Sequence, residues 1–364
     1  MFKSKLVVLA ATAAALASVA LPADEAHAQQ FVLCNATALR SAIMQANNVP
    51  GPAVLFLSPG CTYMLTAADN PGNSLPVVTS QINVIGNGAT IRRQQTPPAP
   101  PGPAPATDFR IFEVSGPNGR LTLNNLTVRN GRSVSSGNGG GGILVNTGSA
   151  LTLNSVEVTR NFAGVTGPGG GIQSYGTLTL NNSTVSYNFA TDEGGGIGSS
   201  GTATISNSSI AGNASRNGGG GMAATGSLTF TNSRLTDNAT RDWGGGLVAR
   251  NLSGMLTDAL VRGNTANQSG GDPDGGGIRT VGATTLTLER TTVFANHGLG
   301  VGGGGGIANG AGATVNLRNS SVTNNSASNP GGISNNGTVT LTATPVVENY
   351  PTNCASTVVS GCAF

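Results

Sequence analysis

The chain repeats one short pattern eight times, and this repetition limits its possible folds more than any other feature. Each repeat starts with two glycines and an apolar residue and later reaches an asparagine, and successive repeats start 25 to 31 residues apart. The apolar residues are Ile143, Ile172, Ile197, Met222, Leu247, Ile278, Ile307 and Ile333. The asparagines are Asn161, Asn188, Asn213, Asn238, Asn264, Asn296, Asn325 and Asn349. Repeats of this length are typical of solenoids, in which each repeat forms one coil.

Apolar and polar residues alternate over short stretches before each asparagine. Leu178, Leu180 and Val185 stand ten, eight and three residues before Asn188, and most other repeats have apolar residues at the same distances. The positions between them are mostly Thr, Asn or Ser, a period of two that indicates strands with one buried face. One coil cannot bury that face alone, whereas coils stacked about 4.8 Å apart can. With some less regular turns before the first repeat, the sequence predicts an all-β fold, a parallel β-helix of roughly ten or eleven coils.

The asparagines of the repeat are interpreted as structural. A buried asparagine at a coil corner can bond backbone groups and the amide of the next asparagine, as stacked amide ladders do. A ligand-binding role would require these amides to be exposed. We therefore expect a ladder of asparagines along the interior, with no direct part in function.

Four segments follow one another along the chain. Residues 1–28 combine a basic start, an apolar run and the small-x-small site Ala26-His27-Ala28, which together predict a secretory signal. Residues 29–66 are expected to form an N-terminal cap and the first coil, with a short amphipathic helix over Thr37–Asn47. Residues 67–349 are expected to form the β-helix, with a proline-rich loop at 96–106, and residues 350–364 a C-terminal cap.

Four cysteines in an exported chain favour two disulfides. Three pairings are possible, and the simplest joins neighbours in sequence, Cys34 to Cys61 and Cys354 to Cys362. Each of these disulfides would cross-link one end of the molecule. Neither pair has the spacing of metal ligands, and no metal or cofactor is expected.

Charged residues are few, 9% of the chain, and the formal net charge is only +3. The arginines do not gather into a basic stripe, so no nucleic-acid partner is expected. After the signal no apolar stretch is long enough to span a bilayer. We expect an exported monomer that is extracellular or on the outer cell surface, with the periplasm as another location.

The repeat resembles a known bacterial family. Its Gly-Gly-Ile turns are similar to the Gly-Gly-Ala-Ile motif of polymorphic outer membrane protein repeats, and its Val/Ile/Leu-x-x-Asn to their Phe-x-x-Asn. Cys34, the run Leu39-Arg40-Ser41-Ala42-Ile43 and Ala46-Asn47 resemble the Cys-Ser-Leu-Arg-Glu-Ala-type start of bacterial exported β-helix proteins. The resemblance implies a right-handed parallel β-helix at the cell surface, sometimes with an adhesive role.

Acidic residues gather in the loops just before the glycines. They are Asp192, Glu193, Asp242, Asp272 and Asp274, and Trp243 stands beside them. Stacking would bring Asp242 and Asp274 to neighbouring coils, roughly 5 Å apart, and Glu193 two coils and roughly 10 Å from Asp242. These distances bracket the carboxyl separations of glycosidases, and Trp243 could stack on a sugar. Calcium binding by the same acids is a further alternative, although the nonapeptide calcium repeat is absent.

Two functions remain open at this point. The leading hypothesis is a non-catalytic extracellular or cell-surface protein for adhesion, whose partner is carbohydrate or another cell surface. The alternative is a polysaccharide lyase or glycoside hydrolase that uses Glu193, Asp242 and Asp274, although loop acids are commonly just solvated. The motifs of polygalacturonase-like sites are absent, and without lysine past the signal the chain offers few general bases.

A threonine pattern and one histidine complete the candidate residues. Outward Thr-x-Thr pairs such as Thr177/Thr179 and Thr202/Thr204 would form a flat array, interrupted at Met255 and Asn316, that suits ice or another crystal surface. Threonine is also simply a good exposed strand residue. His297 is expected to be a surface residue rather than a ligand.

Overall fold

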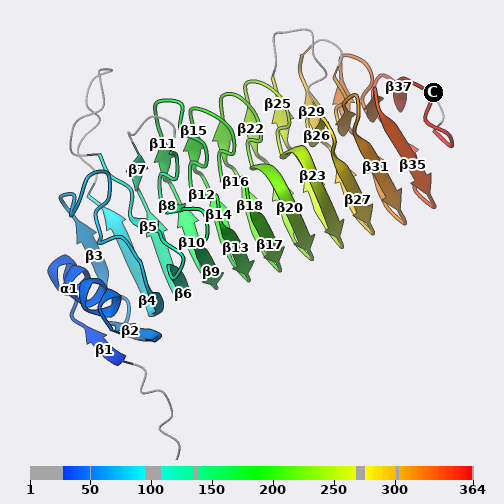
Figure 1. The fold of residues 1–364 in the computed structure, drawn as a ribbon. Coiled ribbons are helices and arrows are strands. Elements are labelled where there is room, and N and C mark those ends of the chain that lie inside the picture. The colour runs from blue at the N-terminus through cyan, green and yellow to red at the C-terminus, as the bar shows by residue number, and fades with distance from the viewer. Residues whose placement is uncertain are drawn as a thin grey trace, which may run out of the picture.

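The computed structural model describes residues 28–49, 51–94, 108–133, 138–267, 275–300 and 303–362. The predicted signal, except Ala28, and the proline-rich loop lie outside these ranges. The described chain is an all-β parallel solenoid of about 11 turns with one short helix near its N-terminus, which confirms the predicted fold class. Figure 1 shows the coils stacked along one axis from α1 to β37.

Strands of equivalent coils form four stacks, in which neighbouring strands pair in parallel. The first stack holds β5 (Phe112–Val114), β8 (Ile143–Val145), β12 (Ile172–Ser174), β16 (Ile197–Ser199), the starts of β20 (Met222–Thr231) and β23 (Leu247–Thr257), β26 (Ile278–Val281), β30 (Ile307–Asn309), β34 (Ile333–Asn335) and β37 (Cys354–Ser356). The second holds β1 (Ala28–Val32), β2 (Ala53–Leu57), the starts of β4 (Gln81–Arg93) and β6 (Arg120–Arg129), β9 (Ala150–Asn154), β13 (Thr177–Asn181), β17 (Thr202–Ser206), the ends of β20 and β23, β27 (Thr285–Glu289), β31 (Thr314–Arg318) and β35 (Thr338–Thr342).

The other two stacks complete each coil. The third holds β3 (Thr62–Leu65), the ends of β4 and β6, β10 (Glu157–Thr159), β14 (Thr184–Ser186), β18 (Ser209–Ala211), β21 (Arg234–Thr236), β24 (Leu260–Arg262), β28 (Thr292–Phe294), β32 (Ser321–Thr323) and β36 (Val346–Val347). The fourth holds β7 (Arg132–Ser133), β11 (Phe162–Ala163), β15 (Phe189–Ala190), β19 (Ala214–Ser215), β22 (Ala239–Thr240), β25 (Thr265–Ala266), β29 (His297–Gly298) and β33 (Ser326–Ala327).

The register of the stacks keeps equivalent residues of the repeat next to one another. Leu178 pairs with Leu151 on one side and with Ala203 on the other, and all three side chains are buried. Apolar side chains at the inward positions therefore form continuous columns through the interior. This continuous burial supplies the main driving force for stacking the coils.

The repeat asparagines stack as a ladder in which each amide is fully hydrogen bonded. The Oδ1 of Asn213 accepts from the backbone N–H and the Nδ2 of Asn188, both at 3.0 Å. The Nδ2 of Asn213 donates to the Val185 carbonyl at 2.9 Å and to the Oδ1 of Asn238 at 3.0 Å. Side-chain bonds of the same kind join neighbouring asparagines from Asn161 to Asn349. The amides bind other amides and the backbone in the buried interior, which leaves none of them facing solvent.

Both ends of the ladder differ from the repeat. At the start the backbone N–H of Gly131 donates to the Oδ1 of Asn161 at 2.8 Å, so Gly131 holds the ladder position in the coil before Asn161. Asn130 takes the left-handed conformation, with φ +62°, that is common to the residue just before each ladder position. At the far end the Oδ1 of Asn353 accepts from the N–H and Nδ2 of Asn349, and nothing in the eight-fold repeat predicted this residue.

The last glycine before each apolar residue makes room for the asparagine of the same coil. A Cβ on Gly196 would lie 2.9 Å from the Cγ of Asn213, and one on Gly195 would lie 2.2 Å from the Ala214 carbonyl oxygen. Both distances are too short for a side chain at these positions. The glycines of the repeat therefore pack directly against its asparagine, and this explains why the two occur together.

The N-terminal end is closed by α1 (Ala36–Asn47), whose apolar face covers the first coil. The side chain of Asn35 caps the helix by accepting from the N–H of Ala38 at 2.8 Å. Leu39 and Ile43 are among the buried residues of this face. The Cys34–Cys61 disulfide, with 5.7 Å between the Cα atoms, ties the helix to the coil beneath it.

The C-terminal segment covers only part of its end. Its strand β37 pairs with β34 and thus extends the first stack, and the Cys354–Cys362 disulfide closes the segment. In the second stack β35 is the last strand, and its inward Val339 and Leu341 are only partly buried. Among the residues described up to 362, the C-terminal segment therefore adds a partial further coil.

Replacing a central ladder residue should lower the free energy of unfolding strongly. In Asn238→Ala the N–H and Nδ2 of Asn213 lose their acceptor and the Ile210 carbonyl loses a donor, all in the interior. We expect the free energy of unfolding to fall by about 3 kcal/mol or more, measured by chemical denaturation. The control is Asn316→Ala on the outer side of β31, which should change it by less than about 0.5 kcal/mol. Equal effects of the two changes would contradict the structural role of the ladder.

The glycine column gives a second prediction. A Cβ on Gly221 would lie 2.7 Å from the Gly246 carbonyl oxygen and 2.9 Å from the Nδ2 of Asn238. We expect Gly221→Ala to destabilise the fold by about 3 kcal/mol, because backbone must move. Gly148, with φ +81° and open space around its Cβ, is the control, and Gly148→Ala should cost about 1 kcal/mol of backbone strain alone. The thermal midpoints of the two variants compare these costs.

Candidate binding groove

A groove of about 200 Å³ runs across the outer face of the first stack. Its floor is formed by Gln173, Gly198, Ala223 and Val248, which follow one another in register at the middle of the first-stack strands. One wall consists of the residues two positions after each floor residue, Tyr175, Ser200, Thr225 and Arg250. Pro168, Asp192 and Glu193 from the loops before the glycines form the other wall. The small residues Gly198 and Ala223 leave the space that makes the groove.

An ion pair connects the two walls. The Arg250 guanidinium donates to both carboxylate oxygens of Glu193, at 2.8 and 2.7 Å. The side chains are 28% and 21% exposed, so the pair is more shielded than an ordinary surface bridge. The hydrogen bond to Glu193 raises the pKa of Arg250. With both oxygens engaged, this carboxylate is poorly placed to act as a free general acid or base.

The other acids of the loops lie in a neighbouring column. Glu193 pairs with Gly218, and Gly218 with Trp243, so Glu193 is aligned with Trp243 rather than with Asp242. Asp192 accepts at 2.9 Å from the Nδ2 of Asn217. The backbone N–H of Asp242 donates to the Thr240 hydroxyl at 3.2 Å.

Two of the predicted acids lie outside the described residues. They are Asp272 and Asp274. The proposed pairing of Asp242 with Asp274 therefore stays a prediction.

Trp243 packs against its own loop column. A Cβ on Gly218 would lie 2.5 Å from the Cδ1 of Trp243, so the indole covers the Gly218 backbone. The side chain is half-buried, and its Nε1 is buried without a hydrogen-bond partner. The Cδ1–Nε1 edge of the ring thus lies against the protein.

Tyr175, Gln173 and Arg250 were missed as candidates. Burial raises the pKa of the Tyr175 phenol, Arg110 opposes this rise, and the negative charge of Asp192 adds to it. All three residues stand one or three positions after the apolar residue of a Gly-Gly-apolar triplet. Aligning the repeats on the glycines instead of on the asparagine places Tyr175, Ser200, Thr225 and Arg250 in one column.

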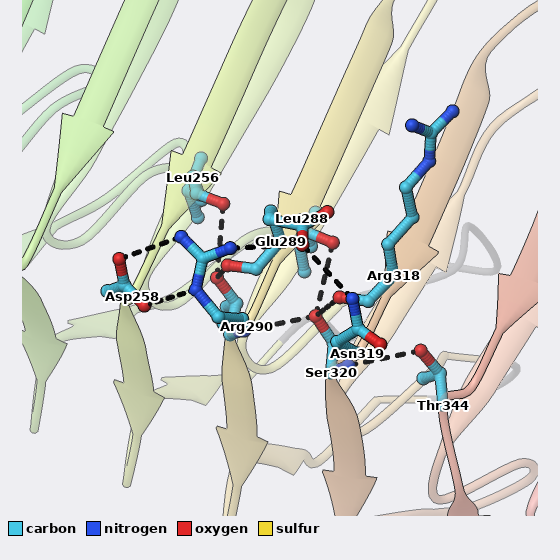
Figure 2. A network of polar contacts seen from close by, with 10 residues as sticks. Leu256, Asp258, Leu288, Glu289, Arg290, Arg318, Asn319, Ser320 and Thr344 are labelled. Atoms are coloured by element: carbon cyan, nitrogen blue, oxygen red, sulfur yellow. Dashed lines mark hydrogen bonds and ion pairs between the residues drawn. The ribbon is translucent and has the colours of Figure 1, made fainter.

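A separate network of charges holds the corner between the second and third stacks (Figure 2). Arg290 donates to both carboxylate oxygens of Asp258, at 2.7 and 3.0 Å, and pairs with Glu289 at 3.1 Å. The hydrogen bond from Arg290 lowers the pKa of Asp258. Arg290 itself sits in the left-handed conformation of the corner, with φ +47°. The Asp258–Arg290 pair is about half exposed and joins consecutive corners. We therefore interpret it as a surface ion pair that stabilises the stacking of the coils.

The remaining sequence candidates are all at the surface. The threonine pairs align in register, with Thr179 beside Thr152 and Thr204, on the outer face of the second stack. His297 is exposed, and its Nδ1 lies 2.7 Å from the Ser326 hydroxyl. Among the described residues no three His, Cys, Asp or Glu side chains are close enough to hold a metal ion. In the same part of the chain no helix has the length and apolarity needed to cross a membrane.

Comparison with known proteins bears on the fold. Residues 170–350 match the family model described as the right handed beta helix region. The fold named by this model agrees with the parallel β-solenoid described above. The matched segment includes the whole groove except Pro168, whereas no match supports the more specific resemblance to polymorphic outer membrane protein repeats. No curated protein matches the chain.

One solved structure with detectable similarity is the crystal structure of PfbA, a surface adhesin of Streptococcus pneumoniae. The identity is 11%, the alignment covers 85% of this β-helix and 88% of that chain, and the TM-score is 0.37. At this level of similarity the comparison carries no argument about function.

The ion pair across the groove should contribute measurably to stability. A double-mutant cycle with Glu193→Gln and Arg250→Met is expected to give a coupling energy of about 1–2 kcal/mol, because the pair is bidentate and largely shielded. The exposed Asp258–Arg290 pair, tested with Asp258→Asn and Arg290→Met, is the control and should show a smaller coupling that falls further in high salt. A coupling near zero for Glu193 and Arg250 would show that the bridge is not formed in solution.

Proposed function

We propose that this β-helix is an exported, non-catalytic protein that adheres to surfaces by binding carbohydrate in the groove over β12, β16, β20 and β23. The observation that carries the proposal is the Glu193–Arg250 bridge. It occupies both oxygens of a carboxylate that an enzyme would need, and it leaves a groove lined by hydroxyl, amide and charged groups. Such linings suit the many hydroxyls of a sugar chain.

Export to an oxidising compartment is supported by three features. The first residues of the chain have the pattern of a secretory signal. Two disulfides close the ends of the described chain, and no free cysteine is present there. We place the protein outside the cell or at the outer cell surface, as a monomer, and we regard a relationship to polymorphic outer membrane proteins as part of this proposal.

The proposal is tested by a glycan array with the disulfide-intact protein that lacks residues 1–28. We expect selective binding to a set of polysaccharides without release of shorter products. Arg250→Met should weaken this binding about tenfold, because the wall of the groove loses its anchor. The matched control is Arg318→Met, which makes the same substitution on the outer side of β31.

Turnover would contradict the proposal. If a polysaccharide panel shows cleavage that Asp242→Asn or Asp274→Asn abolishes, the protein is the lyase or hydrolase that the loop acids suggested. Absence of binding to every glycan would refute the proposal as well.

A further inference from the structure

We infer that the outer face of the fourth stack holds a second binding site, where a sugar ring stacks on Phe189 and lies over Ala214. The inference rests on the proposed function for the class of partner, carbohydrate, but not for the place of binding. The groove is lined by residues of the first stack and by the loops before the glycines. Figure 1 shows the fourth stack from β7 through β11 and β15 to β22 along one edge of the solenoid.

A row of stacked side chains runs along this face and then stops. It begins with the Arg132 guanidinium, 4.4 Å from the centre of the Phe162 ring. Phe162 stacks on Phe189, with ring centres 5.5 Å apart and ring planes at 13°. The three residues pair in register, and both rings are only partly buried. Among the described residues no further aromatic ring or guanidinium stacks on the far side of Phe189.

The next two coils have small residues at the same outward position. Phe189 pairs with Ala214, and Ala214 pairs with Ala239. Neighbouring coils lie about 4.8 Å apart, a separation that suits stacked rings. A flat ring placed over Ala214 would therefore continue the row. It would also cover apolar surface of Phe189, which is favourable.

The corner beside this position has the same change from large to small residues. Tyr187 is 67% exposed, and the Arg160 guanidinium lies 6.0 Å from the centre of its ring. The ring leans toward the next coil, where a Cβ on Gly212 would lie 2.9 Å from the Tyr187 Cε1. One coil thus presents Tyr187 and Phe189, and the next presents Gly212 and Ala214. Two aromatic side chains therefore border the same open surface.

The charges beside the alanines favour a sugar over the other ligands that stack on aromatic rings. Arg216 and Arg241 each stand two residues after one of the alanines, and both are exposed. Neither forms an ion pair within the described part of the chain. The two guanidiniums disfavour a cation over Phe189, although cations commonly stack on aromatic rings. Their N–H groups can donate to the oxygens of a sugar whose C–H face lies on the ring.

Two aspartates stand close to these arginines in the loops. Asp192 accepts at 2.9 Å from the Nδ2 of Asn217, and Asp242 directly follows Arg241 in the chain. The two arginines and the two aspartates together carry no formal net charge. Binding here should therefore depend on ring stacking and hydrogen bonds and change little with salt. A nucleic acid or another polyanion would instead bind with a strong salt dependence.

Isothermal titration of the disulfide-intact protein without residues 1–28 tests the inference, with oligomers of glucose, N-acetylglucosamine and galacturonic acid as probes. The titrations are made in the wild type and in Arg250→Met, in which the groove is impaired. Ala214→Phe would fill the place of the sugar with a ring that the two preceding coils already carry. Added to Arg250→Met, it should weaken the remaining binding about tenfold or more, without lowering the thermal midpoint. Phe189→Ala removes the stacking ring and should weaken the same binding about tenfold.

Two matched changes on other parts of the outer surface are the controls. Ser326→Phe adds a ring at the equivalent position near the far end of the fourth stack, and Phe294→Ala removes a ring from the third stack. Neither should change the affinity. Thermal unfolding of each variant shows whether a loss of binding comes from misfolding, and Ala214→Phe, which keeps Phe189 in place, tests the site even if Phe189→Ala is unstable.

The outcomes separate this inference from the proposed function. Binding that disappears in Arg250→Met alone, or that neither Ala214→Phe nor Phe189→Ala weakens, overturns the site on the fourth stack while the groove stands. Binding that Arg250→Met leaves unchanged and Ala214→Phe removes supports the inference and refutes the groove. Absence of binding by the wild type overturns both. A steep fall of affinity with salt overturns the stacking of a sugar ring in favour of a polyanion.

Discussion

The contact between the asparagine ladder and the glycine column is the constraint on which the rest of the structure depends. Each ladder amide makes its hydrogen bonds to the coils before and after it, and the space it occupies exists because the facing residue has no Cβ. A coil that lacked either partner would bury unsatisfied polar groups or clash with the next coil. The contact therefore fixes the register of successive coils, and all outer surfaces follow from that register.

The groove is one of these surfaces. Register places the middle residues of β12, β16, β20 and β23 in a line, and the loops before the glycines rise beside it. Glu193 and Arg250 are 57 residues apart in sequence, yet the stacking brings their side chains to 2.7 Å. The same geometry puts the Gln173 amide over Gly198. A rigid, repetitive interior thus presents side chains that differ from coil to coil, which is how solenoids commonly form binding surfaces.

The fold could be predicted from sequence in some detail because the repeat is local. Each asparagine follows the inward apolar residues of its repeat at fixed distances, as Asn188 follows Leu178 and Val185. These distances predict which side chains face inward. In the coil before Asn161 the ladder position belongs to Gly131, and Asn130 takes the left-handed conformation found just before each ladder position.

The site was harder to predict because it depends on the loops and on long side chains. The loop acids were identified, but Asp242 stands one residue out of register with Glu193: Glu193 lies five residues after Asn188, whereas Asp242 lies four after Asn238. Gln173 looks in sequence like any outward polar residue of a strand, yet it is buried over Gly198 of the next coil. The sequence did not indicate that Arg250 belongs to the site, because its partner Glu193 lies two coils earlier.

The most direct measurement of the central claim is a crystal structure of the protein with a bound oligosaccharide. The account predicts sugar density over the floor from Gln173 to Val248, with the Glu193–Arg250 bridge intact. Sugar density on the threonine face of the second stack, or a bridge opened so that Glu193 approaches a glycosidic oxygen, would contradict it.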